Sequence, residues 1–301
     1  LFDDFLVLAL AVNHNRHNLK TPNIHVLYHM AQNKQQIKPM LPFTFPDAEA
    51  HAASSSDAAA PSASEPYADE SFTFTLTQDD GSRSFGFCRR LPRLPGVSRP
   101  VCLCVLSRRP WFSLFMRFLD IVRDKFELHT FVPAFVTAMQ DAPLPRPGEC
   151  FAVDSIVGDP RLGALRLATP VDDRPTGLDL EPLFSSLGIV KALRVLAALM
   201  LEQRVVFVAD SLSKVSACAH GVLSLLYPLE WQHIFIPILP PSMISYVCAP
   251  MPFVLGVMSR DVHKLENEPM DTVMVVNLED GCISGDASLL EEAQLPRALR
   301  E

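Results

Sequence analysis

The most informative hydrophobic pattern lies between residues 204 and 239. Val205–Val208 is a continuous apolar run rich in β-branched residues, which predicts a strand buried on both faces. After a polar break at 210–213, apolar residues recur at helical spacing over 215–226, and Pro228 ends the predicted helix. A second apolar run covers 234–239. Strand, helix and strand in this order predict a βαβ unit with parallel strands.

An alternating pattern marks the first half of the chain. Phe72, Phe74 and Leu76 alternate with threonines, Phe85 and Phe87 alternate with small residues, and 78–82 supplies turn residues between them. This period of two predicts a β-hairpin. Other apolar runs predict further strands at 5–12, 101–106, 151–153, 165–167, 253–257 and 273–278, and helices at 111–126, 131–139 and 187–201.

The order of these elements predicts two lobes. Residues 1–144 form an α+β lobe, an antiparallel sheet with helices, and residues 145–301 form a doubly wound, mostly parallel α/β lobe. Proline-rich residues 143–148 are interpreted as the linker. Residues 48–70 are rich in Ala, Ser and Pro and carry five acids but no Lys or Arg, which predicts a disordered insertion in the first lobe.

Composition narrows the class of protein. A formal net charge of -8 over 301 residues argues against nucleic acid or anionic lipid as the main partner. The seven cysteines lie mostly in apolar runs, as reduced intracellular thiols do, and no secretory signal is visible. Residues 231–259 lack charge over a membrane-spanning length, but five prolines argue against a transmembrane helix. The chain begins without Met, so we expect a segment of a longer protein.

The sequence holds few patterns that support chemistry. No phosphate-binding loop, GxGxxG, GxSxG or HExxH motif is present. Cys102 and Cys104 face one side of a strand but lack two further zinc ligands, which favours core packing. His220 is interpreted as structural, because no nucleophile or carboxylate can be placed beside it. We therefore expect no metal, no cofactor and no catalytic residue.

The loop at 210–214 has two interpretations of equal weight. It follows a strand that is predicted to be parallel and begins a helix, and open α/β sheets bind ligands at this end of their strands. The alternative is an ordinary helix start capped by Ser211 or Ser213.

Several unlinked motifs occur in a consistent order along most of residues 1–285. They are Phe72–Leu76, Gly81–Arg89, Cys102–Ser107, Pro110–Phe112, Leu201–Val205, Leu212–Ser213, Ala217–His220, Leu226–Pro228, Trp231–His233, Ile236–Pro241 and Cys248–Phe253. Together they resemble the DENN domain, a guanine-nucleotide exchange module for Rab GTPases, and are most similar to the connecdenn subgroup. The resemblance implies a longin-like uDENN lobe followed by an α/β cDENN lobe. The third, helical part (dDENN) is missing or only begun after Leu295.

The resemblance also implies a mechanism. Such a protein is not an enzyme of bond chemistry: it binds the nucleotide-free GTPase more tightly than the loaded form, and so promotes GDP release. We expect it to act in endocytic or endosomal traffic, in the cytoplasm, with membrane contact only indirect through the lipidated Rab. A Rab would bind across both lobes, and the residues expected to contact it are Arg83, Phe85, Ser211, Leu212, Lys214, Trp231 and His233. Core packing is the alternative for Phe85 and Trp231.

Two rival functions remain open. One is a longin-type scaffold that binds a GTPase or coat protein without exchange activity. The other is a small-molecule enzyme at Ser211, which is the weakest because no acid, base and nucleophile converge there. The sequence names neither the Rab nor the oligomeric state.

Overall fold

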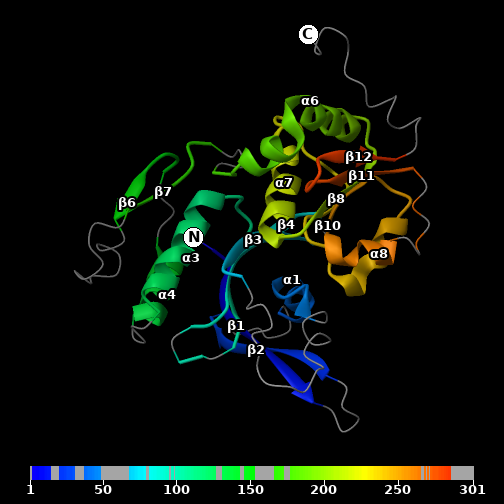
Figure 1. The fold of residues 1–301 in the computed structure, drawn as a ribbon. Coiled ribbons are helices and arrows are strands. Elements are labelled where there is room, and N and C mark those ends of the chain that lie inside the picture. The colour runs from blue at the N-terminus through cyan, green and yellow to red at the C-terminus, as the bar shows by residue number, and fades with distance from the viewer. Residues whose placement is uncertain are drawn as a thin grey trace. The chain divides into compact units, whose positions relative to one another are not determined.

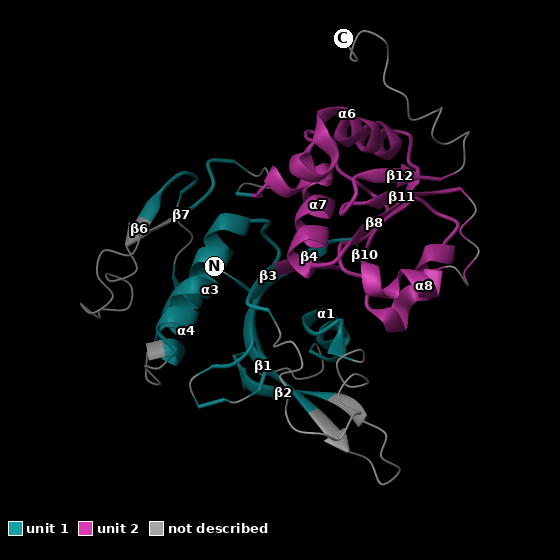
Figure 2. Ribbon diagram, viewed as in Figure 1, with its two compact units in different colours: residues 1–71, 78–177 teal, residues 72–77, 178–301 magenta. Residues whose placement is uncertain are grey.

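The computed structural model describes residues 2–14, 20–30, 37–48, 68–78, 81–94, 96–97, 99–126, 131–142, 146–152, 166–172, 177–265, 268, 270 and 272–285. It divides into two compact units (Figures 1 and 2). Unit 1 comprises residues 1–71 and 78–177, and unit 2 comprises 72–77 and 178–301. The predicted lobe boundary at 144 stays a prediction. Most of the predicted insertion at 48–70 lies outside the described residues.

Unit 1 is built on an antiparallel sheet. Strand β1 (Asp4–His14) pairs with β2 (Lys20–His29) on one side and with β5 (Val101–Ser107) on the other, and β5 pairs with β4 (Arg83–Leu91). A separate two-stranded pair joins β6 (Cys150–Ala152) to β7 (Arg166–Ala168). The predicted antiparallel lobe is thereby confirmed.

Aromatic side chains fill the core between this sheet and its helices. The predicted amphipathic helix is α3 (Phe112–Asp124), and α4 (Phe131–Asp141) follows it. Phe115 of α3 lies 4.8 Å from Phe87 of β4 between ring centroids, and Phe118 lies 5.0 Å from Phe135 of α4. All four rings are fully buried, so the helical spacing of the α3 phenylalanines anchors that helix on the sheet.

Arg90 lies on the other face of β4 from Phe87, because successive side chains of a strand alternate. Its guanidinium lies 2.7 Å from Asp47 Oδ1 and 2.7 Å from Glu70 Oε2. Asp47 follows the short helices η2 (Lys38–Met40) and α1 (Leu41–Thr44), and Glu70 begins β3 (Glu70–Thr77). These three buried side chains tie chain segments far apart in sequence to the sheet.

The turn of the predicted hairpin is also present. The Gln78 N–H donates to the Ser82 carbonyl (2.8 Å), and Gly81 adopts a φ of 81°. Only glycine adopts this backbone region readily, which explains its place in the turn. The two predicted strands, β3 and β4, flank this turn.

Unit 2 contains a five-stranded sheet in the order β12-β11-β8-β10-β9. Strands β8 (Arg204–Ala209), β9 (Ile234–Ile236), β10 (Phe253–Met258) and β11 (Val273–Asn277) are parallel. Strand β12 (Cys282–Ser284) is antiparallel to β11. The predicted mostly parallel α/β lobe is confirmed, and β10 inserts between the two strands of the βαβ unit.

The helices of unit 2 cover this sheet (Figure 1). Helix α7 (Leu212–Ser224) packs on β8 and β10 and against α6 (Glu181–Met200). A side chain at Gly256 of β10 would meet Val215 of α7 at 2.8 Å, so glycine permits this close approach. The uncharged stretch at 231–259 folds as β9, the helical turns η4 (Pro241–Cys248) and β10, in agreement with the expectation that it is not a membrane helix. After β10 come η5 (Ser259–Asp261) and α8 (Val262–Leu265).

Among the described helices, α6 alone is long and apolar enough in composition to cross a membrane. Helices of a protein core meet the same criterion, and Gly188 interrupts the helical backbone of α6 with a φ of 65°.

Candidate partner-binding surfaces

The parallel strands of unit 2 present two edges that hold candidate residues. All four run in one direction, so the segments that follow β8 and β11 meet at one edge, called here the carboxyl edge. The segments that precede β8, β9 and β10 meet at the opposite edge, called here the amino edge. Strand β8 is six residues long, and at about 3.3 Å per residue the two edges lie roughly 17 Å apart.

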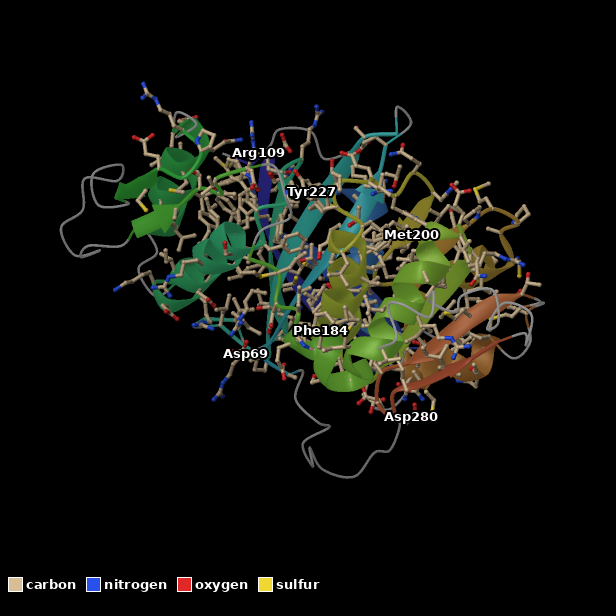
Figure 3. All side chains as sticks on the ribbon, turned by 90° about the horizontal axis from the view of Figure 1, so that it is seen from above. Asp69, Arg109, Phe184, Met200, Tyr227 and Asp280 are labelled. Carbon is tan, nitrogen blue, oxygen red and sulfur yellow. The ribbon has the colours of Figure 1, made fainter. Side chains whose placement is uncertain are left out.

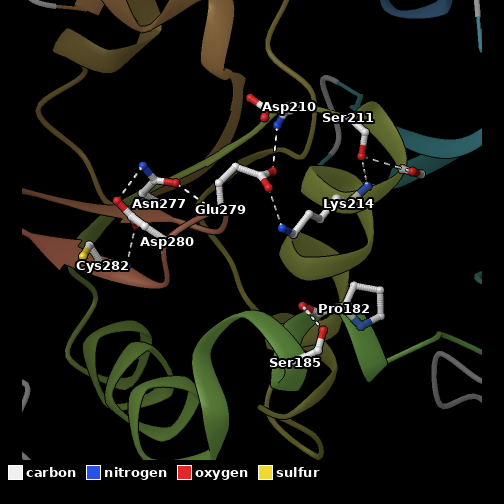
Figure 4. A network of polar contacts seen from close by, with 10 residues as sticks. Pro182, Ser185, Asp210, Ser211, Lys214, Asn277, Glu279, Asp280 and Cys282 are labelled. Atoms are coloured by element: carbon white, nitrogen blue, oxygen red, sulfur yellow. Dashed lines mark hydrogen bonds and ion pairs between the residues drawn. The ribbon is translucent and has the colours of Figure 1, made fainter.

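Ser211 and Lys214 lie at the carboxyl edge (Figure 4). Ser211 is the N-cap of α7, and its Oγ accepts a hydrogen bond from the Lys214 N–H (3.3 Å). Lys214 Nζ in turn donates to Glu279 Oε2 (2.9 Å), and the Asp210 N–H donates to Glu279 Oε1 (3.0 Å). Glu279 follows β11, so it joins the two loops of this edge.

The polar groups of this edge are largely satisfied by one another. The Glu279 N–H donates to Asn277 Oδ1 (2.9 Å), whose amide donates to Asp280 (3.3 Å). The hydrogen bonds from Asp210 and Lys214 hold the pKa of Glu279 below its usual value, because they stabilise the carboxylate. The side chain of Leu212, the third residue expected here, is fully buried. The loop is therefore a capped helix start, and its role in binding stays a prediction.

Trp231 and His233 lie at the amino edge, immediately before β9. Trp231 is 6% exposed, and its Nε1–H donates to the Ile234 carbonyl (3.1 Å). The imidazole of His233 packs edge-on against Trp231 at 5.1 Å, and its Nε2 lies 3.1 Å from Glu202 Oε1. Glu202 belongs to the turn that precedes β8, so this contact ties two loops of the amino edge together. The five expected residues of unit 2 thus form two groups at opposite edges of one sheet.

The two expected residues of unit 1 lie on β4. Arg83, its first residue, is partly exposed. Phe85 is also partly exposed, and its ring lies 6.4 Å from Phe87 and 6.3 Å from Phe112. Phe85 therefore lies at the margin of the aromatic core.

The described residues contain no group of three or more His, Cys, Asp or Glu side chains arranged to hold a metal ion. Cys102 and Cys104 are fully buried in β5, and Cys88 of β4 lies opposite Cys104 in register. Burial raises the pKa of the Cys88 thiol, and hydrogen bonds with Cys102 and Cys104 raise it further. All three cysteines are fully buried, so they act as small core side chains.

Comparison with known families identifies the family of this chain. Residues 98–281 match the DENN (AEX-3) domain, and residues 28–91 match the uDENN domain. The chain belongs to the DENN family. This confirms the family that the sequence motifs predicted.

Curated relatives agree with the family match. The chain is 37% identical over 288 residues to DENN domain-containing protein 2B of mouse and of human, which covers 92% of this chain and 24% of each relative. It is 38% identical over 251 residues to mouse DENN domain-containing protein 2A, covering 83% of this chain and 24% of that protein. The chain therefore spans about a quarter of the length of these relatives. DENN-domain proteins are generally exchange factors for Rab GTPases and act by binding rather than by bond chemistry.

One group of residues at the amino edge was not anticipated from the sequence. Met200, Leu201, Tyr227, Leu229, Tyr246 and Met251 all expose between 42% and 62% of their surface. A sequence signal did exist: Leu225–Leu229 continues an apolar run past the end of the α7 periodicity into a loop. Apolar residues that fall outside the periodic pattern of a helix or strand are not predicted to be buried in the core.

Proposed function

We propose that this chain is the Rab-binding part of a guanine-nucleotide exchange factor and promotes GDP release from a Rab-family GTPase. The observation that carries the proposal is the succession of a uDENN match over 28–91 and a DENN match over 98–281 in one chain. The site of action is the cytoplasmic face of vesicle or endosome membranes, in endocytic traffic. The lipidated Rab supplies the membrane contact.

The mechanism is a coupling of two binding equilibria. The protein binds the nucleotide-free GTPase more tightly than the GDP-loaded form. Because coupling is reciprocal, binding of the protein weakens the affinity of the GTPase for GDP by the same factor. A thousandfold weakening of nucleotide binding requires about 4 kcal/mol of difference in affinity between the two GTPase states. Surfaces rather than reacting groups supply this difference, so the proposal needs no acid, base or metal.

The experiment is a nucleotide-release assay. The 301-residue chain is mixed with a panel of purified Rabs loaded with fluorescent GDP, and the loss of fluorescence is followed after excess GTP is added. Faster release from one or a few Rabs supports exchange activity. Binding to a nucleotide-free Rab without faster release points instead to the scaffold function. The absence of any Rab binding refutes exchange activity and leaves only a scaffold for a coat protein or another GTPase.

A further inference from the structure

Exposed apolar side chains in unit 2 gather at one edge of its sheet. Eight large apolar residues among those described in this unit are exposed, and six of them belong to the helix ends and loops of the amino edge. We call these six the amino-edge patch: Met200, Leu201, Tyr227, Leu229, Tyr246 and Met251. The other two, Ile189 and Val190, lie near the opposite end of the second segment of α6.

Contacts between the loops bring the members of this patch to the same edge. Glu202, which directly follows Leu201, lies 3.1 Å from His233 in the segment that follows Leu229. The guanidinium of Arg204 donates to the Ala249 carbonyl (3.4 Å), between Tyr246 and Met251. The strand register places the starts of β8, β9 and β10 side by side, since Phe253 lies opposite Ile234, and Val254 lies opposite Val205.

Figure 3 shows the same separation of the two edges. The labelled Met200 and Tyr227 lie toward one side of the unit in that view, whereas Asp280 of the carboxyl edge lies toward the other. Helix α6 reaches both edges. Near its break at Gly188, Lys191 Nζ donates to the Gly281 carbonyl (2.7 Å) beside Asp280, and the helix ends at Met200.

The chemistry of the patch is that of a protein-binding surface. Its members include two tyrosines and two methionines, which are residue types enriched at the centre of protein interfaces. Two of the neighbouring charges, Glu202 and Glu230, are exposed acids, while Arg204 is turned toward a backbone carbonyl of its own unit. The carboxyl edge differs, because its lysine and acids bond to one another and its leucine is buried.

We propose that the amino-edge patch is the surface of unit 2 that docks the small GTPase, through an apolar area of the GTPase flanked by basic side chains. The inference rests on the proposed function and assigns its binding surface. It places the main contact at the edge that holds Trp231 and His233, and not at the Ser211 loop. The buried indole of Trp231 donates to the Ile234 carbonyl and so fixes the start of β9 at this edge.

The charges beside the patch favour a GTPase over two other occupants, an anionic lipid surface and a second copy of this chain. Exposed glutamates beside the patch repel an anionic lipid surface. In a two-fold dimer of this chain the same patch would face itself, so Glu202 and Glu230 would lie near their own copies, and like charges across an interface lower affinity. A GTPase surface with basic residues beside an apolar area would attract both glutamates and would not bring like charges together.

The test compares two double variants on one helix and its neighbouring loop. Met200→Ser with Leu229→Ser removes two residues of the patch, each 62% exposed. Ile189→Ser with Val190→Ser removes two residues that are 67% and 68% exposed but lie near the other edge. Affinity for the nucleotide-free Rab identified in the release panel is measured by titration calorimetry. We expect the patch variant to weaken binding at least tenfold, and the control variant to change it less than twofold.

A charge reversal provides a second variant that cannot be attributed to lost folding. Glu230 is exposed, so Glu230→Lys leaves the core intact, and we expect it to slow association and to reduce the effect of added salt on the association rate. Circular dichroism and thermal melting of every variant check that the fold is retained.

The outcomes separate this inference from the proposed function. If the wild-type chain binds no Rab, the proposed function fails and the inference fails with it. If the wild-type chain accelerates GDP release and the patch variant does so equally well, while Lys214→Glu abolishes release, only the inference is overturned. A concentration-dependent dimer that the patch variant abolishes, with Rab affinity unchanged, overturns it in favour of a second copy of the chain.

Discussion

Replacing Arg90 tests whether the buried charge cluster of unit 1 stabilises the fold. The guanidinium of Arg90 is 4% exposed, and its partners Asp47 and Glu70 are 1% and 8% exposed. Burial opposes the charge of Arg90, but the two carboxylates outweigh it and raise the pKa of the guanidinium. The variant Arg90→Met fills similar space and leaves two buried carboxylates without their cation. Removing one partner of a buried ion pair costs about 3–5 kcal/mol.

The neighbouring arginine is a matched control. Arg89 lies on the other face of β4, is 20% exposed, and pairs with Asp69 and Asp120, which are 46% and 31% exposed. Exposed pairs contribute about 0–1 kcal/mol, so Arg89→Met should cost several-fold less than Arg90→Met. The chain has two tryptophans, Trp111 in unit 1 and Trp231 in unit 2. Urea unfolding in a Trp231→Phe background therefore reports on unit 1 through Trp111 fluorescence.

A rescue experiment separates buried charge from lost packing. Adding Asp47→Asn and Glu70→Gln to Arg90→Met removes the uncompensated charges, and we expect part of the lost free energy of unfolding to return, because neutral amides are less costly to bury than carboxylates. Equal costs for Arg89→Met and Arg90→Met, or no recovery in the triple variant, would show that the cluster is not the source of the stability.

Two further predictions concern unit 2. The Ser216 hydroxyl of α7 donates to the Thr73 carbonyl (2.8 Å) and accepts from the Thr73 N–H (2.9 Å), so Ser216→Ala should lower the free energy of unfolding by about 1–3 kcal/mol, as measured by urea titration. Ser224→Ala on the same helix should cost much less, because the Ser224 hydroxyl only donates to the Gly221 carbonyl one turn earlier. Glu279 has a lowered pKa in the folded state, so its contribution is complete above its usual pKa of 4.5 and is lost as pH falls through the folded value. Glu279→Gln should therefore cost a few tenths of a kcal/mol at pH 7, since the ion pair is partly exposed, and the gap in urea midpoint should narrow as the pH falls below 4.5; a gap that widens on acidification would contradict this account.

Local periodicity predicted many of the elements, but it missed β2 (Lys20–His29) and β12 (Cys282–Ser284), and it did not predict the order of the strands in space. The apolar run at Val205–Val208 and the helical spacing that follows it identified β8 and α7. A strand buried on both faces leaves a continuous apolar run, whereas a helix buried on one face leaves apolar residues at helical spacing. The insertion of β10 between β8 and β9 has no local signal. It brings Gly256 of β10, more than forty residues after β8 in the sequence, against Val215 of α7 and the backbone of Pro237.

The candidate residues likewise divide into those whose contacts the local sequence predicts and those whose contacts it does not. A serine after a strand and before a helix predicts an N-cap, and Ser211 is one. Its neighbour Lys214 meets Glu279, an acid 65 residues away, and no spacing in the sequence indicates this pairing. The sequence also grouped Ser211 with Trp231, because the family motif Leu212–Ser213 directly follows Ser211 and the motif Trp231–His233 begins at Trp231. Motif membership carries no information about which end of a strand a residue occupies.

The magnitude required of an exchange factor makes the amino-edge patch sufficient in principle. A thousandfold acceleration corresponds to about 4 kcal/mol, and apolar burial contributes about 25 cal/mol per Å², so roughly 160 Å² of apolar surface must be buried only in the nucleotide-free complex. An aromatic side chain buries about 150–250 Å² when it is fully enclosed. One residue such as Tyr227, together with part of Leu229, could then carry the whole difference between the two GTPase states, provided that the GTPase offers a pocket for them only after GDP leaves. The ion pair between Lys214 and Glu279 lacks this capacity, because an exposed pair contributes at most about 1 kcal/mol and is already satisfied within unit 2.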